Sequence, residues 1–262
     1  MIAALSDVDA AEPTDWIVGS WFMTRYGRVD LQTVLPIGAA VEQVDRTSVR
    51  LHLLSRSGLH SVYDPTGQGR MEPSLGFQRN QGLGCAAMVG SHWWVVDPAA
   101  GTLRTTDPRG STIPQERWAG VARGPGDELV LADGHQWLVT YDVERGTETR
   151  RFPAAVWPSR RVTTGECAPV LVGNGWYGTF SNLTSLLSVC DRDGRLVGHR
   201  RLDRLLGLGD NRITAVGAGG RRLGVGYGAD LFTFEVDFGP ECHGQGSVEA
   251  RVSGRSSGAV PP

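Results

Sequence analysis

Lysine is absent from this chain, since all 26 of its basic residues are arginine. This excludes a lysine Schiff base, a lysine general base and the phosphate-binding lysine of a P-loop. The formal net charge is only −2, so no overall field attracts nucleic acid or an anionic membrane surface. We therefore expect neither nucleic acid nor a membrane among the partners.

Long apolar runs and cysteine pairs are also missing. No stretch approaches the ~20 apolar residues that cross a bilayer, and the N-terminal MIAALSDVDAAEPTD has neither the basic start nor the apolar core of a secretory signal. We expect a cytoplasmic protein. The chain has four cysteines and no Cys-x-x-Cys pair, which predicts free thiols and not a disulfide framework.

Glycine, in contrast, is abundant, with 36 residues in a chain of 262, nearly twice the usual ~7%. Leu, Glu and Ala form no long blocks of the kind that helices need. The composition therefore favours many short strands joined by many turns.

Strands that end at an aspartate recur along the chain, and all but the first are followed by a glycine. An Asp side chain accepts a hydrogen bond from the backbone two residues on, and glycine takes the positive φ that closes a hairpin. The intervals between successive aspartates are 34, 43, 35, 49 and 46 residues, close to the ~40–50 residues of one propeller blade. The aspartates are Asp30, Asp64, Asp107, Asp142, Asp191 and Asp237.

Six such units predict an all-β fold, a six-bladed β-propeller of four-stranded antiparallel blades. We expect one domain at 1–252 and a flexible tail at 253–262. A β-sandwich also uses short strands and turns, but it gives no reason for this period. Two points stay open: residues 181–189 form either a strand or a helical turn, and the outer strand of the last blade is either 247–252 or 2–5.

Aromatic residues in the expected strands are interpreted as packing residues between blades. This interpretation covers Trp93, Trp94, Trp137 and Trp176. Four histidines also lie in or beside strands, and we expect them to be packed or surface residues and not metal ligands. They are His52, His60, His92 and His135.

Two segments carry a family resemblance. Leu83-Gly84-Cys85 is followed by Trp93-Trp94-Val95-Val96-Asp97 and then by 101–108, and GNGWYGTF at 173–180 has the form G-x-x-W-x-G-T-M with Phe in the last place. Both are similar to segments of the regucalcin/gluconolactonase-like (NHL-type) six-bladed propellers. The resemblance spans roughly 83–236 and implies the same fold, with metal-dependent lactone hydrolysis as the activity of the family.

The resemblance also implies a metal site, because that family holds a divalent ion with a Glu, an Asn and an Asp at the channel mouth. Cys85 stands at the position of the Glu, Gly165-Glu166 stands at an Asn-Asp dipeptide of the family, and Asn211 is near its metal-binding Asn. A thiol in place of a hard oxygen ligand disfavours Ca²⁺ and Mg²⁺.

Links between blades are the expected place for a binding site, since each passes the same face near the central channel. We expect these links at 70–85, 111–118, 153–167, 200–212 and from 239 onward, lining one funnel. Arginines there would offer forked donors, and a tryptophan a stacking face, to a carboxylate, a phosphate or a planar ring; otherwise they form a solvated rim. The predicted ligand-binding residues are Arg79, Arg117, Trp118, Arg160, Arg161 and Arg212.

The same links carry acid–base and thiol side chains. An enzyme in this funnel would use Glu166 or His243 as a base, and the full candidate catalytic set is Glu166, Asp210, Asn211 and His243. Thiols suit a soft metal such as zinc or copper, although cysteine is also among the most buried residue types. The candidate metal ligands are Cys85, Cys167 and Cys242.

These observations predict a binding or interaction module whose funnel takes a small anionic or aromatic ligand or a peptide. The alternative is an enzyme, a lyase, cyclase or lactone hydrolase, that uses the same funnel. A divalent metal is the cofactor left open. A nucleotide cofactor is not expected, because the glycine-rich stretch 207–228 leads into strands and not into a helix.

Overall fold

The computed structural model describes most of the strand-forming part of the chain. The described residues are 2–4, 16–18, 21–24, 27–30, 36–44, 49–55, 57–63, 69–71, 85–97, 101–108, 113, 118–133, 137–153, 169–181, 184–208, 213, 215–227, 230–237 and 249–257.

Within these described ranges the strands form six antiparallel sheets, which we number I to VI along the chain. Sheet I contains β1 (Ile2–Ala4), β2 (Trp16–Val18), β3 (Trp21–Thr24) and β4 (Gly27–Asp30). Sheet II contains β5 (Pro36–Gln43), β6 (Val49–Ser55), β7 (His60–Tyr63) and β8 (Gly69–Met71). Sheet III contains β9 (Cys85–Val89), β10 (His92–Asp97) and β11 (Thr102–Thr105).

The second half of the chain repeats the plan. Sheet IV contains β12 (Trp118–Arg123), β13 (Glu128–Asp133), β14 (Trp137–Asp142) and β15 (Thr147–Pro153). Sheet V contains β16 (Val170–Gly173), β17 (Trp176–Ser181), β18 (Leu186–Asp191) and β19 (Leu196–Arg201). Sheet VI contains β20 (Ala215–Gly219), β21 (Arg222–Tyr227), β22 (Asp230–Asp237) and β23 (Glu249–Ser257). The expected all-β fold of antiparallel, mostly four-stranded sheets is confirmed.

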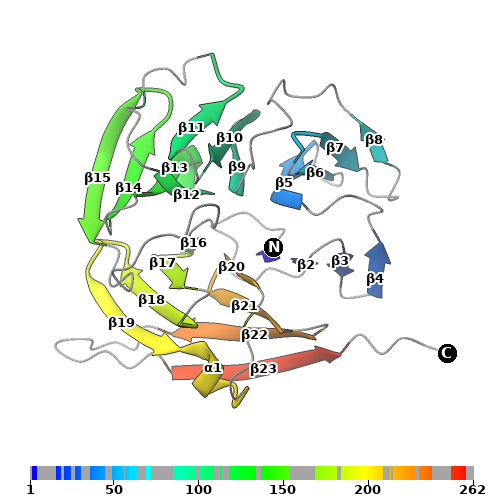
Figure 1. Cartoon of the computed structure of the whole chain (residues 1–262), viewed down its shortest axis with the longest axis vertical. Coiled ribbons are helices and arrows are strands. Elements are labelled where there is room, and N and C mark those ends of the chain that lie inside the picture. The colour runs from blue at the N-terminus through cyan, green and yellow to red at the C-terminus, as the bar shows by residue number, and fades with distance from the viewer. Residues whose placement is uncertain are drawn as a thin grey trace.

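The sheets are arranged around a common centre, with the first strand of each sheet innermost and the later strands farther out (Figure 1). Inner strands contact the inner strands of neighbouring sheets. The contacting pairs are β5 with β9, β9 with β12, β12 with β16, β16 with β20, and β20 with β1. Segments far apart in the sequence therefore lie side by side at the centre, in a propeller-like arrangement.

Both faces of a middle sheet pack against a neighbouring sheet, as the alternation of side chains along a strand requires. In β13, Leu129 and Leu131 join the core shared with sheet III, whereas Val130 and Ala132 join the core shared with sheet V. This explains why ELVLAD reads as a nearly continuous apolar run and not as an alternating one. The outer strand β15 is mostly exposed, as its polar sequence predicts.

Tryptophans fill the spaces between sheets. Trp93 faces the core shared with sheet II, and Trp94 faces the core shared with sheet IV. The packing interpretation is confirmed for these two residues and for Trp176, which are all 2% exposed or less. It is wrong for Trp137, which begins β14 and is 39% exposed.

Aspartates close the hairpins as the sequence predicts. Oδ1 of Asp142 accepts a hydrogen bond from the Arg145 backbone N–H, and Oδ1 of Asp191 accepts from the N–H groups of Asp193 and Arg195. Both turns join the third strand of a sheet to the fourth. Asp30 is different, because it ends β4, the fourth strand of sheet I. The first interval, from Asp30 to Asp64, is therefore not measured from the position that Asp142 and Asp191 have in their sheets.

Two open points of the sequence are settled. Strands β17 and β18 pair as a hairpin, so the segment around 181–189 is not helical in its described residues. The outer strand of sheet VI is β23, while β1 pairs with β2 in sheet I. Strand β23 continues to Ser257, past the domain boundary expected at 252; residues 258–262 lie outside the described part of the chain.

Replacing a leucine in a shared core should cost far more stability than replacing an exposed one. Leu129 is fully buried, and Leu205, in the helix α1 (Leu202–Leu205), is 43% exposed. We expect Leu129→Ala to lower the free energy of unfolding by about 3 kcal/mol and Leu205→Ala by about 0.5 kcal/mol or less. Urea denaturation followed by tryptophan fluorescence measures both; equal losses would contradict the two-sided packing described above.

Candidate functional site

Each sheet has two edges that differ in their connections. At the link edge the inner strand begins, and the chain arrives there from the outer strand of the preceding sheet. At the turn edge the inner strand ends and turns into the second strand, as at Gly219–Arg222 in sheet VI. Because the strands alternate in direction, the connection from the third strand to the fourth also lies at the turn edge.

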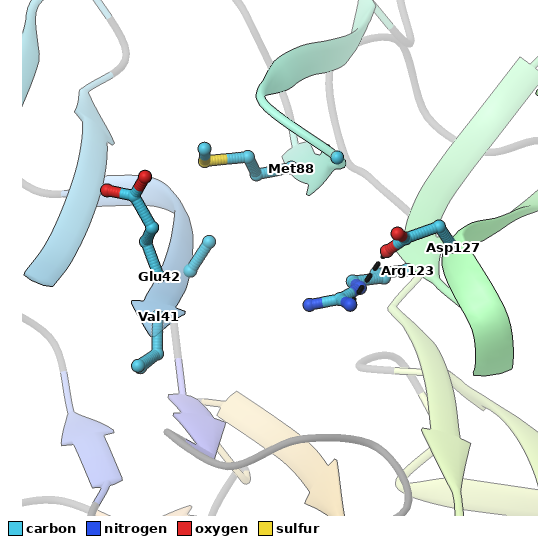
Figure 2. A pocket seen from close by; sticks show the side chains of 7 residues that line it. Val41, Glu42, Met88, Arg123 and Asp127 are labelled. Atoms are coloured by element: carbon cyan, nitrogen blue, oxygen red, sulfur yellow. Dashed lines mark ion pairs between the residues drawn. The ribbon is translucent and has the colours of Figure 1, made fainter. Parts of the chain in front are cut away.

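A hollow of about 180 Å³ lies at the turn edge, where β5, β9 and β12 end. Its lining comes from three sheets (Figure 2). The lining residues are Ala40, Val41, Glu42, Met88, Gly90, Arg123 and Asp127. It therefore combines an apolar part with two carboxylates and one guanidinium, contributed by segments that are some 85 residues apart at the extremes.

The charged wall of the hollow is built by the turn after β12. Gly124 and the 3₁₀ turn Pro125–Asp127 lead into β13, and Gly126 and Asp127 both have a positive φ, of 59° and 64°. Aspartate tolerates this left-handed conformation better than most residues. The turn brings Oδ1 of Asp127 to 2.7 Å from Nη2 of Arg123, and the Arg123 guanidinium extends into the hollow in Figure 2.

A hydrogen-bonded chain runs from the opposite wall into sheet II. Oε2 of Glu42 is 3.0 Å from Nε2 of His52, and Nδ1 of His52 is 3.0 Å from Nε2 of His60. A carboxylate only accepts, so His52 donates through Nε2. With Nε2 protonated in a neutral ring, Nδ1 of His52 accepts a hydrogen bond from Nε2–H of His60. His52 is 8% exposed, and His60 contacts Trp93 edge to face. His52 and His60 are packed residues, as expected, because their rings stack on each other and His60 also contacts Trp93.

None of the residues that line the hollow is predicted as a site residue from the sequence. Arg123 and Asp127 flank Gly-Pro-Gly, a turn signal with a charge of each sign one turn apart, and this is the pattern that would have drawn attention to them. Glu42 and Met88 carry no such signal, since each is one residue of an ordinary strand.

Most residues of the predicted funnel lie outside the described part of the chain. This group comprises Arg79, Arg117, Arg160, Arg161, Arg212, Glu166, Asp210, Asn211, His243, Cys167 and Cys242. Their roles remain predictions. Trp118 begins β12 and is 1% exposed, with its ring edge-on to Tyr141 in the core shared with sheet III; ligand stacking by Trp118 is likewise a prediction that this packing does not test.

The topology corrects one assumption about the funnel. The connection 238–248 joins β22 to β23 within sheet VI, and the pair Asp237 and Glu249 places both of its ends at the turn edge. It is not a link between sheets. Its ends are thus on the edge opposite to the links that carry Glu166, Asp210 and Asn211, so a single funnel shared with His243 does not follow from the connectivity.

The two edges also matter for the predicted thiol site. Cys85 begins β9 at the link edge and is a free, partly buried thiol, whereas the connection that carries Cys242 has its ends at the turn edge. Within the described ranges, no three His, Cys, Asp or Glu side chains group as metal ligands do. Cys167 and Cys242 lie outside the described residues, so the thiol metal site remains a prediction.

One link is described in part and contains a partly buried ion pair, with Arg201 45% exposed. Helix α1 follows β19 directly, and its Asp203 side chain, 8% exposed, receives the Nε–H of Arg201 at 3.1 Å and a second bond from Nη2. These bonds lower the pKa of Asp203 from its ordinary 3.8, against the opposing effect of its burial.

The fold and the hollow define an all-β protein of propeller-like arrangement. No protein-family model and no curated protein sequence matches the chain. One solved structure that matches is described as "Crystal Structure of Mitotic Checkpoint Complex", with a TM-score of 0.45 and 12% identity, over 90% of this chain and 75% of that chain. Among the described residues, no helix is long and apolar enough to cross a membrane.

The Arg201–Asp203 pair should make stability fall in acid. A carboxyl whose pKa is lower in the folded chain stabilises it above the unfolded pKa, and this contribution is lost as the pH falls through the folded pKa. We expect Asp203→Asn to be less stable than the wild type at pH 7, with the difference shrinking below about pH 4.

Denaturant midpoints at several pH values measure this difference. Arg201→Gln should reduce the acid dependence in the same way, and the double variant should lose little more than either single variant. A difference that stays constant from pH 7 to pH 2 would show that the pair does not lower the pKa.

Proposed function

We propose that the protein is a six-bladed β-propeller that serves as a binding module, with a ligand site in the hollow at the turn edge. The observation that supports this function is that three sheets contribute residues to the lining of the hollow. Val41, Met88 and Arg123 reach it from sheets II, III and IV, so the site exists only when the sheets are assembled. Charged groups that converge beside apolar side chains, as Glu42, Arg123 and Asp127 do here, are typical of ligand pockets.

The size of the hollow limits its ligand. Sites for drug-sized molecules have volumes of ~300 Å³ or more, and a dry cavity of ~150 Å³ holds one benzene. At about 180 Å³, the hollow fits a small molecule or one side chain of a bound peptide.

The link edge is the second surface of this proposal. Its predicted arginines, Arg160 and Arg212 among them, would bind an anionic or aromatic ligand or a peptide there, as expected from the sequence. A cytoplasmic location and the absence of nucleic-acid partners are parts of the same prediction.

An enzyme is the second candidate function, and the contact between Glu42 and His52 is what favours it. A carboxylate on the wall of a hollow, held by a hydrogen bond from a buried imidazole at 3.0 Å, is placed to accept a proton from a bound molecule as a general base. The hydrogen bond between His52 and His60 in turn orients the imidazole of His52.

Binding in the hollow is tested by recording backbone amide spectra while a library of small polar molecules is added. We expect at least one compound to shift resonances of 40–42, 88–90 and 123–127 together. Val41→Trp fills the hollow and should abolish these shifts, while Val44→Trp, at a 44% exposed position just beyond β5, should leave them unchanged. Compounds that shift only the link edge, or none that shift the hollow, would refute the proposed site.

A further inference from the structure

Glu42 and Arg123 place a negative and a positive group on opposite walls of the hollow, and their remaining hydrogen-bonding capacity is opposite as well. Glu42 comes from β5 and Arg123 from β12, and Figure 2 shows them on opposite sides with Met88 between. From this arrangement we propose that the hollow binds a free α-amino acid with an apolar side chain. The inference rests on the proposed function, since it names the ligand class for the same site.

The acidic wall is suited to an ammonium group. Both described contacts of Glu42, with His52 at 3.0 Å and with Arg50 at 3.7 Å, use Oε2. Oε1 is therefore left without a partner among the described residues. His52 also fixes the orientation of the carboxylate, which lowers the entropy cost of binding a cation there. A charge-assisted hydrogen bond to Oε1 is of the stronger kind.

The basic wall is suited to a carboxylate. A guanidinium has five N–H donors in a planar fork, and the ion pair of Arg123 with Asp127 involves only Nη2. No described residue accepts a hydrogen bond from Nη1, whereas Nε is shielded by protein atoms. A ligand carboxylate in the hollow provides an acceptor for Nη1. Asp127 keeps the guanidinium in place, because its left-handed backbone directs the carboxylate back at Arg123.

The space between the walls is suited to an aliphatic group. Ala40, Val41 and Met88 supply the apolar lining, and Met88 is a flexible side chain that adapts to different shapes. The lining carries two carboxylates and one guanidinium, so a simple anion meets net negative charge, and a simple cation leaves the Arg123 donors unused. A zwitterion satisfies both walls. A peptide does not, since its terminal ammonium and carboxylate are at opposite ends of the chain.

Three matched probes test the ligand class: L-leucine, 4-methylpentanoate, which lacks the ammonium, and 3-methylbutan-1-amine, which lacks the carboxylate. Each is titrated into the full chain at pH 7 while the amide resonances of 40–42, 88–90 and 123–127 are followed. We expect L-leucine to bind at least about tenfold more tightly than either analogue, because each analogue forfeits one charge-assisted hydrogen bond.

Variants assign the two walls. Glu42→Gln should remove the preference for L-leucine over 4-methylpentanoate, and Arg123→Gln the preference over 3-methylbutan-1-amine. Glu144→Gln and Arg145→Gln, in the exposed turn after β14, are the matched controls and should change neither. Circular dichroism establishes that each variant is folded.

The inference is overturned if the three probes bind equally, if either analogue matches L-leucine, or if none of the three binds. In the last case the library described under "Proposed function" separates the outcomes. A different compound bound in the hollow would leave the binding module intact and refute only the amino acid, while no compound at all would refute both.

Discussion

The fold depends on the need to cover both faces of a sheet at once. In β10 and β13 successive side chains are apolar on both faces, so a sheet of this kind is not stable with one face in water. Sheets arranged around a common centre satisfy the requirement, because a sheet then has a neighbour to cover each of its two faces. Single residues of β13 show this constraint. Leu129 and Leu131 pack against sheet III, and Val130 and Ala132, which alternate with them, pack against sheet V.

This arrangement leaves functional chemistry to the ends of the strands. Side chains at the start and in the middle of β12 are committed to packing, whereas Ala122 and Arg123 at its turn edge are only partly buried. Arg123 and Asp127 belong to one turn, yet they share a hollow with Val41 and Glu42 from another sheet. The Glu42–His52–His60 chain extends the polar character of that edge into the interface between sheets II and III.

Local patterns in the sequence predict local structure well. The hairpins at Asp142 and Asp191 were predictable because the side chain of the aspartate makes the turn with its own neighbours. Trp93 and Trp94 were recognised as packing residues, while Trp137 was not recognised as exposed, because its position at the start of β14 and not its type decides its burial. The link at 239 onward was misassigned because pairing of β22 with β23 is a long-range choice that no local signal encodes.

The sequence by itself determined the all-β class, the repeating hairpins and the residues that fill the spaces between sheets, since these follow from periodicity, turn chemistry and the hydrophobic effect within short segments. Only the tertiary structure decided which strand ends meet, that β23 and not β1 completes sheet VI, and that Glu42, Met88 and Arg123 line one hollow. The reason is that a site between sheets is made by contacts between residues far apart in the chain, and their proximity is a property of the assembled sheets and of no segment within them.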